Sequence, residues 1–153
     1  MIKVLFVCLG NICRSPMAEA VFADLVDRAG LTHQFQVDSA GTAGYHVGEP
    51  AHRGTRNVLA KHSINYRGQA RQITGNDLDT FDYVVAMDSH NLSDLQYQSN
   101  RANNLYRLLD FAKNTDVRDV PDPYYSGNFD YVYQLVQDGA DGLLEYIKKE
   151  RNL

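Results

Sequence analysis

The stretch that decides the fold of this chain reads KVLFVCLGNICRSPM and runs from Lys3 to Met17. Its first five residues form a short, mostly apolar and β-branched run, which is typical of a strand buried on both faces. A helix is expected from Pro16 to Val26, because apolar residues recur there at helical spacing. Ser15 is a favourable N-cap, Pro16 suits the first helical position, and Gly30 offers a C-terminal stop. The sequence therefore predicts a strand, a short loop and a helix.

The same alternation continues along the chain. Further strands are expected at Phe35–Ser39, Asp82–Met87 and Leu105–Leu109, and further helices at Thr55–His62, Ser89–Gln98 and Phe129–Lys149. Ser89 is expected to cap its helix, and Gly139 and Gly142 interrupt the pattern of the last one. Strands that alternate with helices predict a parallel sheet with helices on both faces. We expect a single α/β domain over residues 1–153, with four strands and ligand sites at their carboxyl ends.

Composition bounds the class of protein. The chain has 15 basic and 19 acidic residues, a formal net charge of −4, whereas a general nucleic-acid-binding protein usually carries a basic excess. No apolar run approaches the roughly 18–20 residues that span a bilayer, and the run Ile2–Leu9 is too short for a signal peptide. We therefore expect a cytoplasmic protein without a nucleic-acid or membrane partner. The sequence leaves the oligomeric state open, with a monomer as the default.

The two cysteines, Cys8 and Cys13, both lie near the start of the chain. Two cysteines on one short segment cannot connect distant parts of a fold, and they are too few for a structural zinc site. They lie beside Arg14, whose positive charge favours a thiolate. The five histidines show no metal-ligand spacing, so we expect neither a metal nor a cofactor. The cysteine pattern indicates chemistry rather than architecture.

The loop from Cys8 to Ser15 combines three features of an anion site. The helix that follows presents free N–H groups and the positive end of its dipole. Gly10 and Asn11 tolerate left-handed backbone angles, which let successive N–H groups turn inward. Arg14 adds a planar fork that matches two phosphate oxygens. With Cys8 at the base of this cradle, the arrangement favours in-line transfer of a phosphoryl group to sulfur.

A plainer interpretation treats Cys8 as a small buried hydrophobe and Arg14 as a surface charge. It is the default for an isolated free cysteine, and a cysteine followed six positions later by an arginine is a weak signal alone. The strand before the loop and the Ser15-Pro16 helix start after it supply the context that the catalytic interpretation requires. We therefore favour an anion-binding loop that contains a nucleophile.

The segment Val7–Glu19, VCLGNICRSPMAE, resembles the signature loop of the low-molecular-weight protein tyrosine phosphatases. Further matches to this family occur in order along nearly the whole chain, at Val37–Thr42, Ala70–Ile73, Phe81–Tyr83, Met87–Asp88 and Val120–Tyr125. The resemblance implies a single α/β domain with a four-stranded parallel sheet and a phosphate-binding loop after the first strand. It also implies hydrolysis of phosphotyrosine and small aryl phosphates, with tyrosine-phosphorylated proteins as partners in signalling.

The resemblance implies a role for each residue of the loop. Cys8 would be the nucleophile that forms a phosphocysteine intermediate. Asn11 would hold the strained backbone of the loop, and Ser15 would donate a hydrogen bond to the Cys8 sulfur and ease its departure. The Arg14 side chain would bind the phosphoryl oxygens together with the backbone N–H groups of the loop, which belong to Leu9, Gly10, Asn11, Ile12, Cys13 and Arg14. Cys13 would be the second loop thiol.

The resemblance at Asp122-Pro123-Tyr124-Tyr125 implies a general acid and an aromatic wall. A phenol with a pKa of about 10 leaves more easily when an acid protonates it, and Asp122 is the candidate. The same carboxylate would then activate water against the phosphocysteine. An Asp-Pro pair is otherwise most often a turn. Tyr124 and Tyr125 would line a slot for the aryl ring, with Tyr45 on the opposite wall.

Other activities on this scaffold are less well supported by the residues. A thioredoxin-coupled arsenate reductase needs further cysteines downstream, and the chain has none after Cys13. A protein arginine phosphatase carries threonine where this chain has Ile12, a bulky side chain that should favour an aryl group over a guanidinium. A phosphate-binding module without turnover needs neither the thiol of Cys8 nor the acid Asp122. For Asp88, support of the loop and a position at a helix N-terminus or in a turn are equal alternatives.

Overall fold

The first strand, β1 (Ile2–Cys8), lies inside the sheet with a neighbour on each side. In the computed structural model, which describes residues 1–101 and 103–153, the strand order is β2-β1-β3-β4 and every neighbouring pair is parallel. The other strands are β2 (Phe35–Gly41), β3 (Tyr83–Ala86) and β4 (Leu105–Arg107). An inner strand of a parallel sheet is covered on both faces, which explains why β1 is a nearly uninterrupted apolar run.

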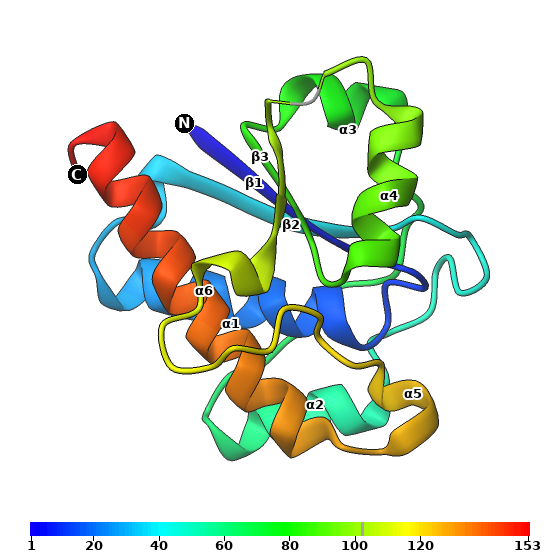
Figure 1. Cartoon of the computed structure of the whole chain (residues 1–153). Helices are drawn as coiled ribbons and strands as arrows, with labels where there is room; N and C mark the ends of the chain where they lie inside the picture. Colours follow the sequence, from blue (N-terminus) through cyan, green and yellow to red (C-terminus); the bar gives the residue numbers. More distant parts are fainter. Residues whose placement is uncertain (102) are drawn as a thin grey trace.

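Helices cover both faces of this sheet (Figure 1). They are α1 (Arg14–Arg28), α2 (Arg53–Lys61), α3 (Gly75–Thr80), α4 (Ser89–Gln98), α5 (Pro123–Ser126) and α6 (Phe129–Arg151). Two short 3₁₀ segments, Thr32–Gln34 and Leu108–Phe111, precede β2 and follow β4. The predicted α/β fold, a four-stranded parallel sheet with helices on both faces, is confirmed.

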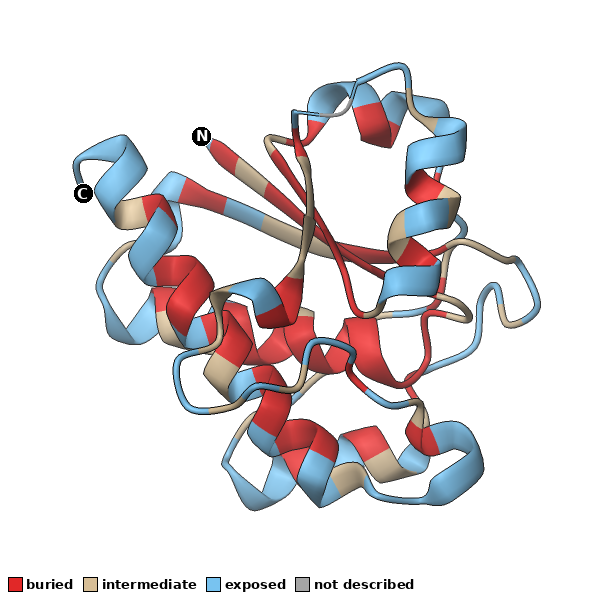
Figure 2. Ribbon diagram, viewed as in Figure 1, coloured by how far each residue is buried: buried red, intermediate tan, exposed pale blue. Residues whose placement is uncertain are grey.

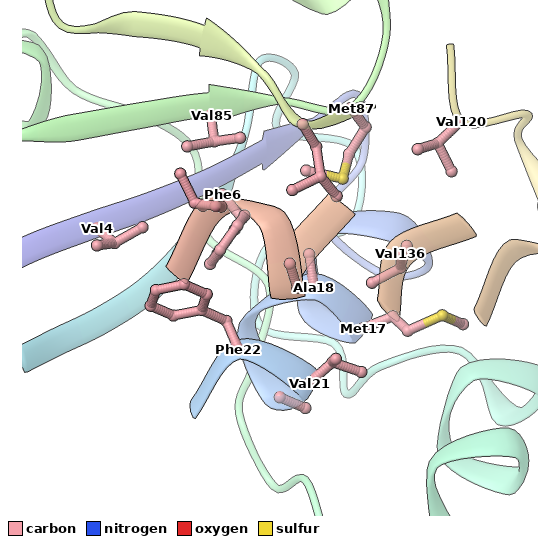
Figure 3. Packing of buried hydrophobic residues seen from close by; sticks show 14 of the residues in the cluster. Val4, Phe6, Met17, Ala18, Val21, Phe22, Val85, Met87, Val120 and Val136 are labelled. Carbon is pink, nitrogen blue, oxygen red and sulfur yellow. The ribbon is translucent and has the colours of Figure 1, made fainter. Parts of the chain in front are cut away.

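Side chains alternate along β1 between two hydrophobic cores. Val4 and Phe6 pack into the larger core with residues of α1 and α6, whereas Leu5 and Val7 pack into the smaller one with residues of α3 and α4. In the larger core the rings of Phe6 and Phe22 lie 5.5 Å apart (Figure 3). The inner strands β1 and β3 and the inner faces of the helices are mostly buried, while the outer faces of the helices are exposed (Figure 2). The loop between β1 and α1 therefore connects two elements that are both packed into the core.

Two predicted helix caps are wrong. Helix α1 begins at Arg14, so Ser15 lies inside the helix, where its hydroxyl contacts the sulfur of Cys8 instead of a backbone N–H. Helix α4 is capped by Asp88, whose carboxylate accepts a hydrogen bond from the N–H of Asn91, and Ser89 is already helical. In the first case the hydroxyl is engaged by the sulfur. In the second a carboxylate, which is the stronger acceptor, takes the capping position.

The predicted strand Leu105–Leu109 is shorter than expected. Only Leu105–Arg107 pairs with β3, and the chain then turns into the 3₁₀ segment. Helices α3 and α5 were not predicted, although α3 has a capping box between Thr74 and Asp77 that the sequence already contains.

Helix α6 is a continuous helix of 23 residues, and the two glycines do not interrupt it. They are required by packing, because a Cβ at Gly142 would collide with the carbonyl oxygen of Phe111 and one at Gly139 would press on Leu108. Among the residues that the structure describes, neither α6 nor any other helix is long and apolar enough to cross a membrane.

Candidate active site

The loop of residues 9–13 lies between Cys8, the last residue of β1, and Arg14, the first residue of α1. Asn11 adopts a left-handed backbone conformation, with φ of 59°, which its short polar side chain tolerates. Within the described part of the chain, no protein oxygen accepts a hydrogen bond from the N–H groups of residues 9–13. With the N-terminus of α1 beside them, these donors are suited to bind an anion.

Gly10 was expected to provide a left-handed backbone angle, but the structure gives it a different role. Its φ is not positive; instead, a Cβ there would approach Cδ2 of His46 to 3.0 Å. Gly41, at the end of β2, also permits a close approach, since a Cβ would lie 2.7 Å from the carbonyl oxygen of Leu9. The carbonyls of Cys8, Leu9 and Ile12 accept hydrogen bonds from the N–H groups of Thr42, Ala43 and His52. Neighbouring segments thus hold the loop through its carbonyl groups and leave its N–H groups for a ligand.

Ser15 connects Cys8 to a buried amide. Its Oγ lies 3.0 Å from the Cys8 Sγ and 2.8 Å from Nδ2 of Asn11. The backbone N–H of Arg71 donates to Oδ1 of Asn11 at 3.0 Å, so the amide must present Nδ2 to Ser15. Ser15 therefore accepts from Asn11 and directs its own proton at Cys8. This hydrogen bond stabilises negative charge on the sulfur.

Arg14 is almost completely buried, with a side chain 4% exposed. Its Nη1 donates to Oδ2 of Asp88 at 2.5 Å and to the carbonyl oxygen of Val120 at 3.0 Å, while Nη2 lies 3.6 Å from Oδ2 of Asp122. Burial acts to lower the pKa of Arg14, but the charges of Cys8, Asp88 and Asp122 outweigh it, so the pKa is raised. The guanidinium is therefore a fixed positive charge in the wall of the site.

Asp88 fulfils both of the roles considered from the sequence. Its Oδ1 accepts the N–H of Asn91 at 2.7 Å and caps α4, whereas its Oδ2 binds Arg14. Asp88 follows the end of β3, and β3 is the parallel neighbour of β1. One carboxylate thus fixes the start of a helix and the orientation of the arginine.

Asp122 lies at the rim of the same site. Its Oδ1 accepts the N–H of Tyr124 at 3.0 Å and caps α5, so the Asp-Pro pair starts a short helix rather than a simple turn. The other oxygen faces Arg14. The side chain is 29% exposed, so a proton on this oxygen can be exchanged with a bound molecule or with water.

A pocket of about 180 Å³ opens above the loop. It is smaller than the roughly 300–1,000 Å³ of sites for drug-sized ligands, so it suits a single small group. The pocket is lined by Cys8, Leu9, Gly10, Ile12, Cys13, Arg14, Tyr45, His46, Asp122, Tyr124 and Tyr125. Asn11 and Ser15, also predicted as site residues, do not line it, because both residues are buried.

The rim of the pocket is aromatic. Tyr124 and Tyr125 meet edge to face with ring centroids 5.1 Å apart, and Tyr45 is mostly exposed among the lining residues. Flat rings with exposed faces are suited to contact another ring. The arrangement can therefore receive an aromatic group whose anionic end reaches the loop.

Two histidines of the site were missed by sequence reasoning. His46 lines the pocket, and its Nδ1 lies 2.9 Å from Oε2 of Glu49. The ring of His52 lies 5.9 Å from that of Tyr124 and stacks on Phe129 at 5.0 Å. The position of His46 next to Tyr45 was a usable signal. The contacts of His52 come from segments distant in the sequence, which spacing does not reveal.

The two thiols, Cys8 and Cys13, are both free and buried. Burial, followed by the negative charges of Asp122 and Cys8, raises the pKa of Cys13 to about 12, with Arg14 opposing the rise. Cys13 is therefore a neutral thiol at physiological pH.

A thiol at the base of a ring of free N–H groups, with a buried arginine and a carboxyl group in the same pocket, is the arrangement that transfers a phosphoryl group to sulfur. Together with the parallel sheet, it defines the class: a cysteine-dependent phosphatase whose anion loop follows the first strand.

Comparison with known proteins narrows this class. Residues 3–153 match the family "Low molecular weight phosphotyrosine protein phosphatase". The low molecular weight protein-tyrosine-phosphatase YfkJ of Bacillus subtilis is 50% identical over 156 residues, covering 100% of each chain. Its crystal structure gives a TM-score of 0.95 over 98% of this chain and 96% of that one. PtpA of Staphylococcus epidermidis, also named a low molecular weight protein-tyrosine-phosphatase, is 45% identical over 100% of this chain and 98% of its own.

A second similar structure carries a different substrate in its name. The crystal structure of DARP, the drosophila arginine phosphatase, gives a TM-score of 0.89 at 31% identity, over 96% of this chain and 98% of that one. The family assignment nevertheless rests on the family match, which covers nearly the whole chain. The chain belongs to the low molecular weight phosphotyrosine protein phosphatases, and it is a protein-tyrosine-phosphatase.

Proposed function

We propose that this phosphatase hydrolyses phosphotyrosine in proteins, and small aryl phosphates, through a phosphocysteine intermediate on Cys8. The observation that carries the proposal is that Cys8, Arg14 and Asp122 line one narrow pocket beneath an aromatic rim. Family membership and the names of the bacterial relatives support the same substrate class.

In the first step, the phosphoryl group lies against the N–H groups of the loop and the Arg14 guanidinium. The Cys8 thiolate attacks phosphorus in line with the phenolic oxygen. The P–O bond to the ring breaks, and its electron pair leaves on that oxygen, which takes a proton from Asp122. The loop N–H groups and Arg14 stabilise the charge on the equatorial oxygens during the transfer.

In the second step, Asp122 acts as the base. It accepts a proton from a water molecule, whose oxygen attacks the phosphorus of the phosphocysteine. The P–S bond breaks, and the electron pair returns to the sulfur of Cys8. Ser15, which lies 3.0 Å from that sulfur, donates a hydrogen bond to the charge that forms there. The products are inorganic phosphate and the enzyme in its starting state.

Discrimination between tyrosine and arginine substrates is assigned to Ile12. This side chain lines the pocket, and an apolar wall leaves the N–H groups of a phosphorylated guanidinium without partners. An aryl ring has no such requirement. The likeness to an arginine phosphatase therefore reflects the shared scaffold, and the pocket wall favours phosphotyrosine.

Turnover of phosphotyrosine, phosphoserine and phosphoarginine peptides tests the proposal directly, with Cys8→Ser as control. We expect hydrolysis of the tyrosine peptide above all, and none by Cys8→Ser, which should still fold and bind phosphate or vanadate. A preference for the arginine peptide would mean that the substrate class is phosphoarginine and not phosphotyrosine. Binding without turnover by the unmodified protein would reduce the function to that of a phosphate-binding module.

We also propose that the protein acts in the cytoplasm as a monomer in tyrosine-phosphate signalling. Free Cys8 and Cys13 support a reducing compartment, because thiols are kept reduced in the cytosol. Cys8, Arg14 and Asp122 of the same chain meet in the pocket, so the proposed chemistry needs no catalytic residue from a second copy.

A further inference from the structure

The hydrogen-bond network beneath Cys8 does not end at Asn11. The second hydrogen of the Asn11 Nδ2 group goes to Oγ of Ser39, at 3.0 Å. Ser39 in turn donates to Oε1 of Glu19 at 2.6 Å, and the hydroxyl of Tyr66 donates to the same oxygen at 2.9 Å. A continuous series of donors and acceptors thus links Cys8 to Glu19 and Tyr66.

The direction of each bond in this series is determined. The amide nitrogen of Asn11 can only donate, so both Ser15 and Ser39 accept from it. Each serine then has a single hydroxyl hydrogen for one other partner. For Ser15 that partner is the sulfur of Cys8, and for Ser39 it is the carboxylate of Glu19. Glu19 is therefore the acceptor that ends the series.

The Tyr66 hydroxyl lies against Gly68 where it contacts Glu19. A Cβ at Gly68 would collide with the Tyr66 hydroxyl, so the absence of a side chain there provides the path. Burial, with the nearby charge of Glu19, raises the pKa of Tyr66. The hydroxyl therefore keeps its proton and remains a donor at neutral pH.

Four groups face the carboxyl group of Glu19. Ser39 and Tyr66 donate hydrogen bonds to it, Arg71 contributes positive charge, and Asp38 contributes negative charge. Burial raises the pKa of Glu19, and the two hydrogen bonds act in the opposite direction. Tyr66 thus opposes the protonation that the buried position of Glu19 promotes.

We infer that Tyr66 and Glu19 are positioning residues that act on Cys8 through Ser39, Asn11 and Ser15. Tyr66 holds the Glu19 carboxylate, which gives the Ser39 hydroxyl its direction. Ser39 then helps to hold the Asn11 amide in place. Because this amide donates to Ser15, the hydroxyl proton of Ser15 is left to point at Cys8. The step that depends most on this order is the departure of the Cys8 sulfur from phosphorus, because negative charge forms on the sulfur there. The inference rests on the proposed function, in which Cys8 is the nucleophile.

Tyr66→Phe removes one donor from the network and keeps the ring. Tyr146→Phe is its matched control, because the Tyr146 hydroxyl also donates to a glutamate, Oε2 of Glu150 at 3.1 Å, within α6. We expect Tyr66→Phe to lower kcat on an aryl phosphate about 3- to 30-fold. KM should fall with kcat, since slower hydrolysis lets the phosphocysteine accumulate, and a pre-steady-state burst should grow. Tyr146→Phe should change none of these quantities.

A second readout does not require turnover. The rate at which iodoacetamide alkylates Cys8 is measured against pH, with the modified peptide located by mass spectrometry. We expect the profile of Tyr66→Phe to move to higher pH than that of Tyr146→Phe, because the negative sulfur loses support. Glu19→Gln retains an acceptor oxygen for both hydroxyls, so its profile should lie nearer to the unmodified protein than that of Glu19→Ala.

Identical kcat values and identical alkylation profiles for Tyr66→Phe and Tyr146→Phe would overturn the inference. Equal effects of Glu19→Gln and Glu19→Ala would also overturn the assignment of Glu19 as the terminal acceptor. If the unmodified protein does not turn over aryl phosphates, the proposed function fails. The alkylation profiles still decide whether Tyr66 and Glu19 act on Cys8.

Discussion

Nη1 of Arg14 donates to Oδ2 of Asp88 at 2.5 Å, while the other oxygen of the same carboxylate caps helix α4. Arg14 follows β1 and Asp88 follows β3, and the two strands are paired in parallel up to Val7 and Ala86. Their carboxyl ends therefore lie side by side. A site formed from two loops far apart in the sequence is thus fixed by the register of the sheet.

Replacing Asp88 by asparagine tests this relationship. The asparagine Oδ1 can still cap α4, but its Nδ2 then faces Nη1 of Arg14, donor against donor. The guanidinium loses its charged acceptor and shifts from the position that binds phosphate. We expect kcat/KM on an aryl phosphate to fall about 10- to 100-fold, measured well below the melting temperature.

The control for Asp88→Asn is Asp119→Asn. Asp119, next to Val120 in the sequence, contacts the start of α4, where its carboxylate accepts the N–H of Ser89 at 2.9 Å, and no ion pair with Arg14 is found for it among the described residues. This variant should keep kcat/KM nearly unchanged. Equal losses in the two variants would mean that Asp88 acts through the helix and not through Arg14.

Asp122→Ala tests the general acid. A tyrosyl leaving group needs its proton, whereas the nitrophenolate of an activated ester leaves well without one. We expect a loss of about 10²- to 10⁴-fold in kcat on a phosphotyrosine peptide, and a much smaller loss on nitrophenyl phosphate. Asp116→Ala, an exposed carboxylate of the same segment, serves as the control. Losses of the same size on both substrates would remove Asp122 from the acid role.

Gly142→Ala tests why α6 contains glycines. Alanine normally stabilises a helix interior by about 0.5–1 kcal/mol relative to glycine. Here a Cβ would collide with the carbonyl oxygen of Phe111, so we expect the free energy of unfolding to fall by about 1–3 kcal/mol in urea titrations. Gly75→Ala, at the start of α3, meets nothing within 4 Å and should be neutral or slightly stabilising. Equal stability of the two variants would contradict the packing argument.

The strands and the larger helices could be predicted because their patterns are local. The apolar run before Cys8 reflects a strand that is buried within the sheet. The helical spacing after Pro16 reflects the face of α1 that is buried against that sheet. The caps of α1 and α4 were assigned to the wrong residues, because local rules rank Ser15 and Ser89 without their contacts in the fold. Ser15 suits a cap, but the sulfur of Cys8 engages its hydroxyl, and Asp88 outcompetes Ser89 as an acceptor.

The centre of the site was predictable for a similar reason, since residues 8–15 form one continuous segment. What could not be predicted are the contacts that cross between segments. Tyr66 and Ser39 both reach Glu19, and His52 meets Tyr124, only because the fold brings their elements together. The spacing of residues in the sequence does not reveal such contacts.

Oxidation of the two loop thiols should depend on pH. Peroxide converts the Cys8 thiolate to a sulfenic acid, and the Cys13 thiolate can then attack that sulfur, form a disulfide and release hydroxide. Burial and the charge of Asp122 still raise the pKa of Cys13 after Cys8 has become the neutral sulfenic acid, so little Cys13 thiolate exists at neutral pH. At pH values below this raised pKa, the thiolate fraction increases about tenfold per pH unit, so ring closure should accelerate as the pH rises.

We therefore expect mild peroxide to give a higher ratio of Cys8–Cys13 disulfide to Cys8 sulfinic acid at about pH 9 than at about pH 7. Peptide mass spectrometry measures both products in the same sample, and recovery of activity with a thiol reductant measures the reversible share. Cys13→Ser, which cannot close the ring, should give sulfinic acid at both pH values. If the disulfide yield of the unmodified protein does not change with pH, the ionisation of Cys13 does not limit closure. If sulfinic acid alone forms at both, Cys13 does not protect the nucleophile, and its burial serves packing.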